Sequence, residues 1–290
     1  MKLSDFYKLV VKFGIDRDPR LDKKSIKSYP DTAILYGSPN TRVKKILVGI
    51  DMEVPEILLA DNLRSKGGLD LVLSHHPEGR AFAVFYEVMM LQIDLLAKAG
   101  IPDKVARQLL DERKREVERR VLPQNHMRSS DAARLLNMPF MCVHTPADNH
   151  VASFIEDLLI SKKPDKVQDI VGILETVPEY HQAKVDFSGP RIILGSPKRP
   201  VGKVFVEMTG GTEGSKDVYD KLYKKGIRTL VVMHLSEEHL KKVKDANLNV
   251  VIAGHISSDN LGLNLLLDRI EKKEKLEIIG CSGFTRIKRI

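Results

Sequence analysis

Residues 45–77 read KILVGIDMEVPEILLADNLRSKGGLDLVLSHHP, and this stretch decides the fold. Two short apolar runs, 46–50 and 69–74, enclose a segment, 55–66, whose apolar residues form a stripe at helical spacing. Short buried strands that alternate with helices are typical of a sheet covered by helices on both faces. The stretch therefore predicts a strand–helix–strand unit, and two histidines follow its second strand directly.

The same alternation continues through the rest of the chain. Apolar runs that predict further strands lie at 140–143, 191–194, 204–206, 230–233 and 250–253. Segments that predict helices lie at 151–159, 216–225 and 259–272. This pattern predicts an α/β protein in which helices cover the sheets.

An internal similarity indicates how these units are arranged. Residues 45–75 and 203–234 each contain a strand, a helix and a second strand that ends on a histidine. Any two units of this kind look alike, so the similarity is either generic or the trace of an ancient duplication. We predict two similar α/β halves, 1–150 and 151–290, with the functional site in the cleft between them.

The segment 104–136 interrupts this alternation. It is strongly charged, and it contains Pro123 and the polar cluster Gln124-Asn-His-Met127. We predict a charged helical insertion of two polar helices joined by a loop. The insertion is either simply exposed or forms a lid over the site.

Length and composition exclude several classes of protein. At roughly 100–200 residues per domain, 290 residues form two domains or one large one. The longest apolar stretch, 81–101, is broken by charged residues, and the N-terminus lacks the apolar core of a signal peptide, so no membrane segment is expected. Only Cys142 and Cys281 are present, which is no disulfide scaffold and favours the reducing cytoplasm.

The net charge of +8 and the pI of 9.3 raise the question of nucleic acid. The basic residues are interleaved with acidic ones, as in 111–120, which favours solvated helix faces. Tryptophan is absent and aromatic residues make up 6%, so few side chains are available to stack on bases. Nucleic acid stays possible as a partner but is not favoured, and a modest positive potential would equally attract a small phosphorylated substrate.

Three groups of candidate metal ligands each follow a predicted strand: His75 and His76, then His144 and Asp148, then His255 and Asp259. Open α/β sheets bind ligands outside the carboxyl ends of their strands. Imidazole and carboxylate donors without a thiol suit zinc, iron, manganese, cobalt or nickel. One such group is weak evidence, because most single histidines are structural. Three groups at equivalent positions predict a metal site.

These motifs resemble those of the NIF-three-like family, named after the NGG-one-interacting factor and also known as GTP cyclohydrolase I type 2 homologues. Its double-histidine motif matches Asp70-Leu-Val-Leu-Ser-His-His-Pro77, and its His-Thr-x-x-Asp motif matches His144-Thr-Pro-Ala-Asp148. Its closing Gly-His-x-x-x-Glu matches Gly254-His255-x-x-x-Asp259. Residues 45–51 match the opening strand, and 197–204 followed by Gly210-Gly211 match the start of the second half. The resemblance extends from about residue 44 to about residue 272.

The resemblance implies a site for two divalent metal ions per chain between two similar α/β halves. The implied ligands are His75, His76, Asp148, His255 and Asp259, with Asp148 or Asp259 as the bridging carboxylate. Asp259 stands where the family has Glu, so its carboxylate is one methylene shorter and the helix must approach more closely, or this ligand is weaker. Relatives form closed rings, which implies a homo-oligomer here, a hexamer built from dimers.

A glycine-rich turn, Gly210-Gly211-Thr212-Glu213-Gly214-Ser215, lies between a predicted strand and a predicted helix. It is either a tight turn with Ser215 as the helix N-cap or an anion-binding helix start. His234 and His239 follow the next strand. His234 corresponds to His75 in the internal similarity and either supports the metal ligands or lies on the surface.

Three functions are compatible with these residues. The first is metal-dependent hydrolysis of a small anionic substrate, nucleotide-like or phosphorylated, and of the GTP cyclohydrolase type by resemblance. The second is a metal-binding or regulatory scaffold without turnover, and the third is nucleic-acid binding. An open coordination position distinguishes the first from the second. We predict the first.

Overall fold

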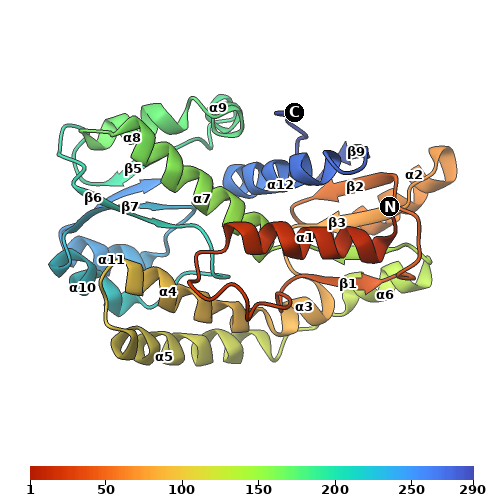
Figure 1. Ribbon diagram of the computed structural model, residues 1–290, viewed down its shortest axis with the longest axis horizontal. Helices are drawn as coiled ribbons and strands as arrows, with labels where there is room; N and C mark the ends of the chain where they lie inside the picture. The colour runs from red at the N-terminus through yellow and green to blue at the C-terminus, as the bar shows by residue number, and fades with distance from the viewer.

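The computed structural model describes residues 1–290 and contains two β-sheets with helices on their faces (Figure 1). The first sheet has the strand order β1-β4-β3-β2-β9. Its strands are β1 (Ala33–Tyr36), β2 (Lys45–Gly49), β3 (Leu71–Ser74), β4 (Phe140–Cys142) and β9 (Glu277–Gly280). All neighbours pair in parallel except β1, which runs antiparallel to β4.

The second sheet has the order β5-β8-β7-β6 and repeats the topology of the first. Its strands are β5 (Arg191–Leu194), β6 (Lys203–Glu207), β7 (Ile227–Val232) and β8 (Asn249–Ile252). Here too the edge strand that comes first in the chain, β5, runs antiparallel to its neighbour β8. The other three strands, β6, β7 and β8, are parallel. The predicted fold class is therefore confirmed, and the matching strand orders are consistent with duplication.

Helices cover both faces of the first sheet. One face packs against α1 (Leu3–Arg17) and α12 (His255–Glu271), and the other against α2 (Val54–Gly67) and α6 (Arg128–Leu135). Buried apolar side chains fill both layers, which is why the strands of this sheet are continuous apolar runs.

The second sheet is covered in the same way. One face packs against α7 (Thr145–Lys162), α8 (Val167–Leu174) and α9 (Pro178–Val185). The other face packs against α4 (Leu91–Lys98), α5 (Asp103–Val121), the short helices η2 (Lys216–Val218) and α10 (Tyr219–Lys224), and α11 (Glu237–Asp245). The remaining short helices, α3 (Gly79–Ala83) and η1 (Phe85–Met90), follow β3.

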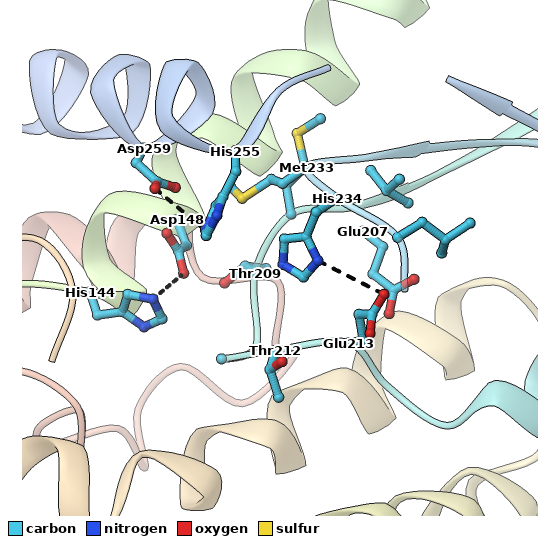
Figure 2. A pocket seen from close by; sticks show the side chains of 14 residues that line it. His144, Asp148, Glu207, Thr209, Thr212, Glu213, Met233, His234, His255 and Asp259 are labelled. Carbon is cyan, nitrogen blue, oxygen red and sulfur yellow. Dashed lines mark ion pairs between the residues drawn. The ribbon is translucent and has the colours of Figure 1, made fainter. Parts of the chain in front are cut away.

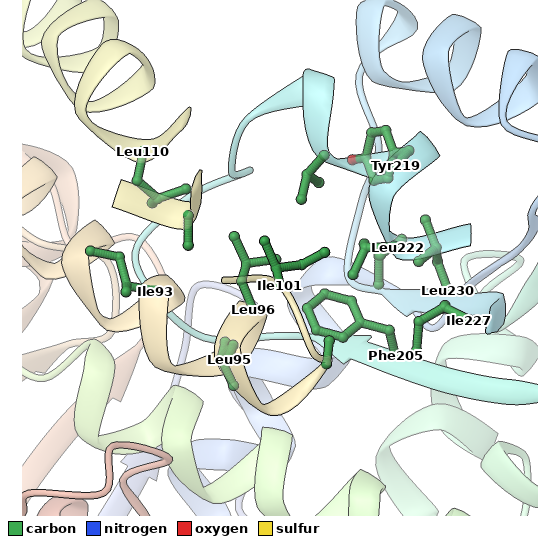
Figure 3. Packing of buried hydrophobic residues seen from close by; sticks show 14 of the residues in the cluster. Ile93, Leu95, Leu96, Ile101, Leu110, Phe205, Tyr219, Leu222, Ile227 and Leu230 are labelled. Atoms are coloured by element: carbon green, nitrogen blue, oxygen red, sulfur yellow. The ribbon is translucent and has the colours of Figure 1, made fainter. Parts of the chain in front are cut away.

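The chain leaves the first sheet for the second and returns to it twice. Helices α4 and α5 come from the first half of the sequence, yet Ile93, Leu96 and Leu110 are buried against Phe205 and Leu222 of the second (Figure 3). The last strand, β9, returns to pair with β2 in the first sheet. Each sheet with its covering helices thus contains segments from both halves of the sequence. The division into domains at residue 150 stays a prediction.

The insertion 104–136 contains the charged helices α5 and α6 and the loop between them. Although α5 is highly charged, one side of it buries Ala106, Leu110, Val117 and Val121 in the core of the second half. The apolar stripe of α5 makes it a structural layer with a solvated outer face.

Two predicted helices begin earlier than expected. Helix α7 starts at Thr145 and α12 at His255, whereas the apolar periodicity predicts starts at 151 and 259. Their first turns are polar because they face the functional site, so hydrophobic periodicity could not detect them. No helix of the chain combines the length and apolarity needed to span a bilayer.

Candidate metal centre

The predicted site residues lie together, between the carboxyl ends of strands from both sheets. His75 and His76 follow β3, and Asp148 is in the first turn of α7 after β4. His255 is the first residue of α12 after β8, with Asp259 one turn further on. Asp148 and Asp259 are almost fully buried, as is His75. The two ligand helices pack against each other, which brings the three groups to one place (Figure 1).

The backbone after β3 directs both histidines into the site. The N–H of His75 donates to Gly49 O and that of His76 to Ile50 O, each at 2.9 Å, so the pairing with β2 continues past the end of the strand. The Ser74 hydroxyl donates to the His76 carbonyl at 2.8 Å and holds the turn. The two rings consequently lie only 5.4 Å apart, centroid to centroid.

Three imidazoles are held by Nδ1 and present Nε2 to the same space. His75 Nδ1 lies 3.0 Å from Val143 O, His76 Nδ1 lies 2.6 Å from Asp51 Oδ1, and His144 Nδ1 lies 2.8 Å from Asp31 Oδ2. A carbonyl or carboxylate on one ring nitrogen fixes the tautomer and leaves the other nitrogen free to bind a metal. This arrangement is typical of metal-binding histidines.

Asp148 and Asp259 connect these imidazoles. Asp148 faces His75 Nε2 with Oδ1 at 3.4 Å and His144 Nε2 with Oδ2 at 3.7 Å. Asp259 faces His75 Nε2 with Oδ1 at 3.5 Å and His76 Nε2 with Oδ2 at 3.4 Å. Two ligands about 2.1 Å from a common ion at a tetrahedral angle stand about 3.4 Å apart, so the separations fit an intervening metal.

Three buried polar atoms at the centre have no hydrogen-bond partner: His75 Nε2, Asp148 Oδ1 and Asp259 Oδ2. Buried polar groups in folded proteins are almost always paired, and an unpaired one is costly. His75 Nε2 lies 3.4 Å from Asp148 Oδ1, and Asp259 Oδ2 lies 3.4 Å from His76 Nε2, so each of these atoms faces another potential metal ligand at a distance that suits a shared cation. Geometry groups His75, His76 and Asp259 as one set of donors and His75, His144 and Asp148 as another.

The metal-free centre has strongly shifted pKa values. Burial alone would lower the pKa of His75, but the carboxylates of Asp259 and Asp148 raise it to about 10. Burial opposes the charge of His76 too, yet Asp259 and Asp51 raise its pKa to about 9. Burial would raise the pKa of Asp259, but His75 and His76 hold it well below its usual range. Imidazolium groups thus take the place of a metal charge.

His255 is less central than the other predicted ligands. Its Nε2 lies 3.5 Å from Asp259 Oδ2, and its side chain is 41% exposed. It is the first residue of α12, after Gly254, whose φ of +111° is a conformation that favours glycine. His255 belongs to neither set of converging donors, and a small movement of its side chain would be needed for it to join one.

The two ligand helices pack closely beside Asp259. A Cβ on Gly262 of α12 would lie 2.5 Å from the Ala147 carbonyl of α7, and only glycine allows this approach. The closer approach expected for the shorter carboxylate stays a prediction.

The two halves contribute equivalent residues. His144 and Asp148 open α7 after β4, and His255 and Asp259 open α12 after β8, so the same His-x-x-x-Asp element follows equivalent strands. His75 after β3 corresponds to His234 after β7. The two halves therefore supply donor residues from equivalent positions in their sheets.

His234 and Glu213 line one side of the cavity beside this centre (Figure 2). His234 Nδ1 lies 3.8 Å from Glu213 Oε1, and the ring of His234 lies 4.8 Å from that of His255, centroid to centroid. Burial would raise the pKa of Glu213, but His234 and the Ser236 N–H lower it to about 2. His239 is buried and contacts Ser236 and Gly214 O, a structural role.

The glycine-rich turn is a structural wall of the cavity. Gly210 and Gly211 have positive φ, and the Gln92 amide donates to the carbonyls of Gly210 and Thr212. Ser215 accepts from the Asp217 N–H as the N-cap of η2, a helix of three residues. The tight-turn interpretation is the one that the contacts support.

Sequence reasoning misses two residues of the site, Asp51 and Asp31, and the resemblance leaves out a third. The resemblance places the candidate ligand His144 in a motif but not among the implied ligands, although its Nε2 converges with Asp148 and His75. Asp51 could have been found, because it directly follows the strand 46–50. Asp31 could not, because it lies in the irregular segment before β1 and meets His144 only in three dimensions.

Several solved structures share this architecture over nearly the whole chain. A NIF3 superfamily protein from Sphaerobacter thermophilus has a TM-score of 0.79 and 27% identity over 94% of this chain and 97% of that one. Reduced HcgD from Methanocaldococcus jannaschii has a TM-score of 0.60 and 15% identity over 97% of both chains. TTHA1606 from Thermus thermophilus has a TM-score of 0.53 and 13% identity over 97% of both chains.

No protein-family model and no curated protein matches the sequence. The structural similarity to the Sphaerobacter protein nevertheless extends over nearly the whole chain, and so over most of both halves. The structural neighbours of this chain are NIF3 superfamily proteins, and the resemblance predicted from its histidine motifs is confirmed.

Proposed function

We propose that this protein binds two divalent metal ions and hydrolyses a small anionic substrate, nucleotide-like or phosphorylated. The observation that carries the proposal is that three buried polar atoms without partners, on His75, Asp148 and Asp259, belong to two neighbouring sets of potential metal ligands. His76, His144 and His255 would complete the donor set. Because one imidazole nitrogen binds one ion, His75 can serve only one of the two sites, and Asp148 or Asp259 would bridge.

The charge of the donor set supports an anionic substrate. Neutral imidazoles add no charge, and two carboxylates offset only half of the charge of two divalent ions. Nitrogen and oxygen donors without a thiol suit zinc, iron, manganese, cobalt or nickel. When bound, such ions supply Lewis acidity and an ionised water near neutral pH.

The protein's own residues favour a catalytic function over simple metal storage. The side chains of His76 and His255 are 24% and 41% exposed, so the centre opens to the cavity on one side. His234, oriented by Glu213, lines that cavity and can exchange a proton with a bound substrate. Asp31 and Asp51 hold His144 and His76 in fixed orientations, as preorganised sites require.

The test is a screen of the metal-loaded protein against nucleotides and phosphoesters, before and after chelation. Hydrolysis is expected to disappear on chelation, to return with metal and to be absent from His76→Ala. Cys142→Ala is the control, because its thiol is buried in β4 and outside the site. Activity that survives both the chelator and His76→Ala would defeat the hydrolase proposal. Metal binding without any turnover would favour the scaffold function instead.

We also propose that the chain assembles into a closed ring, a hexamer by resemblance. The resemblance of the histidine motifs to those of the family supports this assembly. Sedimentation velocity at micromolar concentration is expected to show a species several times the 32.7 kDa of one chain. A monomer would contradict this.

Both cysteines are free, which fits the reducing cytoplasm.

A further inference from the structure

A second, outer pocket opens beside the metal centre. His76, His144 and His255 line part of it, so the two are continuous. It encloses about 410 Å³, and sites for small molecules typically span about 300–1,000 Å³. Much of the rest of its wall comes from residues that the centre does not use: Phe82, Phe85, Gln124, Asn125, His126 and Arg128.

The loop between α5 and α6, residues 122–127, is fixed to the double-histidine motif. The Ser129 hydroxyl at the start of α6 donates to Glu78 Oε2 at 2.8 Å, and Glu78 lies two residues after His76. Gly79, with a φ of +54°, allows close contact with the same helix, because a Cβ there would lie 2.2 Å from Ser130 Oγ. The α5–α6 loop is therefore held against the pocket and the metal ligands together.

Two aromatic rings form the apolar part of the pocket. Phe82 and Phe85 stack with their centroids 5.6 Å apart and an interplanar angle of 8°, and both are partly exposed. Gly211 lies beside Phe85, since a Cβ added to Gly211 would lie 3.6 Å from Phe85 Cδ2. An exposed aromatic face in a polar pocket is a surface on which a planar ring can stack.

The polar groups of the α5–α6 loop suit the edge of a heterocycle and an anion. The Gln124 NH₂ donates to Arg120 O, which leaves its carbonyl as an acceptor, and Asn125 Oδ1 accepts from the Met127 N–H, which leaves its NH₂ as a donor. Arg128 is exposed and forms no ion pair. The carboxylates of Asp51, Glu53 and Glu78 line the pocket too. Asp51 is paired with His76 and Glu78 accepts from the Ser129 hydroxyl, so the anionic group of a ligand is expected at Arg128.

We propose that this outer pocket selects the substrate and binds an anionic planar heterocycle of the size of a nucleoside monophosphate. The ring stacks on Phe85, its edge meets Gln124 and Asn125, and its anionic group is placed by Arg128. Binding in this pocket rests on its own residues, whereas the hydrolytic step after binding rests on the proposed function. Phe85 and Arg128 are specificity residues in this scheme, and the insertion supplies the second of them.

Calorimetry on the zinc-loaded full chain tests this with two probes, GMP and ribose 5-phosphate. Phe85→Ala and Phe85→Leu are both expected to weaken GMP binding about tenfold and to leave ribose 5-phosphate unchanged, since stacking on an aromatic ring contributes at least that much. The leucine variant keeps an apolar side chain, so its effect shows the loss of aromatic stacking apart from the loss of apolar packing. Arg128→Ala is expected to weaken both probes about tenfold.

Two matched variants serve as controls. Phe187→Ala removes an exposed phenylalanine on another surface, and Arg134→Ala removes an arginine of α6 that is paired with Asp131; neither should change GMP binding. Zinc content is measured in every variant and should stay at the wild-type value. If GMP fails to bind the zinc-loaded protein, or binds Phe85→Leu and Arg128→Ala as tightly as wild type, the proposal is overturned. If the wild-type protein does not hold zinc, the proposed function is overturned instead. The pocket proposal is then tested by measuring GMP binding to the metal-free chain.

Discussion

Replacing Asp148 or Asp259 by asparagine is expected to abolish tight metal binding. Within 3.7 Å, Asp148 faces two imidazoles and Asp259 faces three, so the loss of either carboxylate removes both a ligand and a negative charge. Loss of a group that merely supports a metal ligand weakens binding by about 10–100-fold, and loss of the ligand itself is expected to exceed about 100-fold. Elemental analysis and metal titration of the purified variants measure the effect.

Two variants sharpen this experiment. Asp157→Asn, on an exposed position of the same helix as Asp148, should bind metal as wild type does. Asp259→Glu, which restores the carboxylate length of the family motif, should retain metal. Full loading of Asp148→Asn and Asp259→Asn with unchanged affinity would show that the converging donors do not form the metal site.

Removing the metal ions is expected to lower the melting temperature by about 10 °C at pH 8 and by less at pH 6. Ions present at about 1,000 times their Kd stabilise a folded chain by about 4 kcal/mol, and each kcal/mol shifts the melting temperature of a chain of this size by about 2–4 °C. In the metal-free protein, the raised pKa of His75, about 10, exceeds its unfolded value. Its stabilisation is therefore complete below about pH 6.5 and is lost as pH rises through about 10.

Differential scanning calorimetry with and without a chelator, at both pH values, measures this difference. The folded metal-free protein keeps His75 as an imidazolium at both pH values, but the unfolded chain binds fewer protons at pH 8, so the metal-free protein is more stable at pH 6 than at pH 8. The control is the Asp148→Asn variant, whose melting temperature should not respond to chelation. Equal melting temperatures for the loaded and stripped wild type at pH 8 would contradict a metal-stabilised centre.

The fold could be predicted because its strands are buried on both faces. Runs such as 46–50 and 250–253 are apolar throughout, and the helices between them have apolar stripes, so the α/β class follows from periodicity. The crossing of α4 and α5 to the second sheet could not be predicted. Their apolar residues indicate burial but not the partner, which depends on tertiary packing with Phe205 and Leu222.

The candidate site could be predicted in part for a similar reason. Histidines and aspartates after apolar strands stand out because such positions meet at one edge of a sheet. The anchors of the rings are different: Val143 contributes a backbone carbonyl, and Asp31 comes from an irregular segment with no pattern. The outer pocket is equally hidden in the sequence, because the loop of the insertion reaches the double-histidine motif through a single hydrogen bond from Ser129.

The return of β9 to the first sheet has a consequence for biosynthesis. As the chain leaves the ribosome, the first sheet lacks its outer strand until residue 280 has emerged, and α4 and α5 have no second sheet to cover until β6 to β8 are made. Asp259 and His255 emerge late as well, on a helix that packs against α1 and α7. The donor set of His75, His76 and Asp259 is therefore complete only after α12 has emerged, whereas all residues of the other set, His75, His144 and Asp148, are made within the first half of the chain.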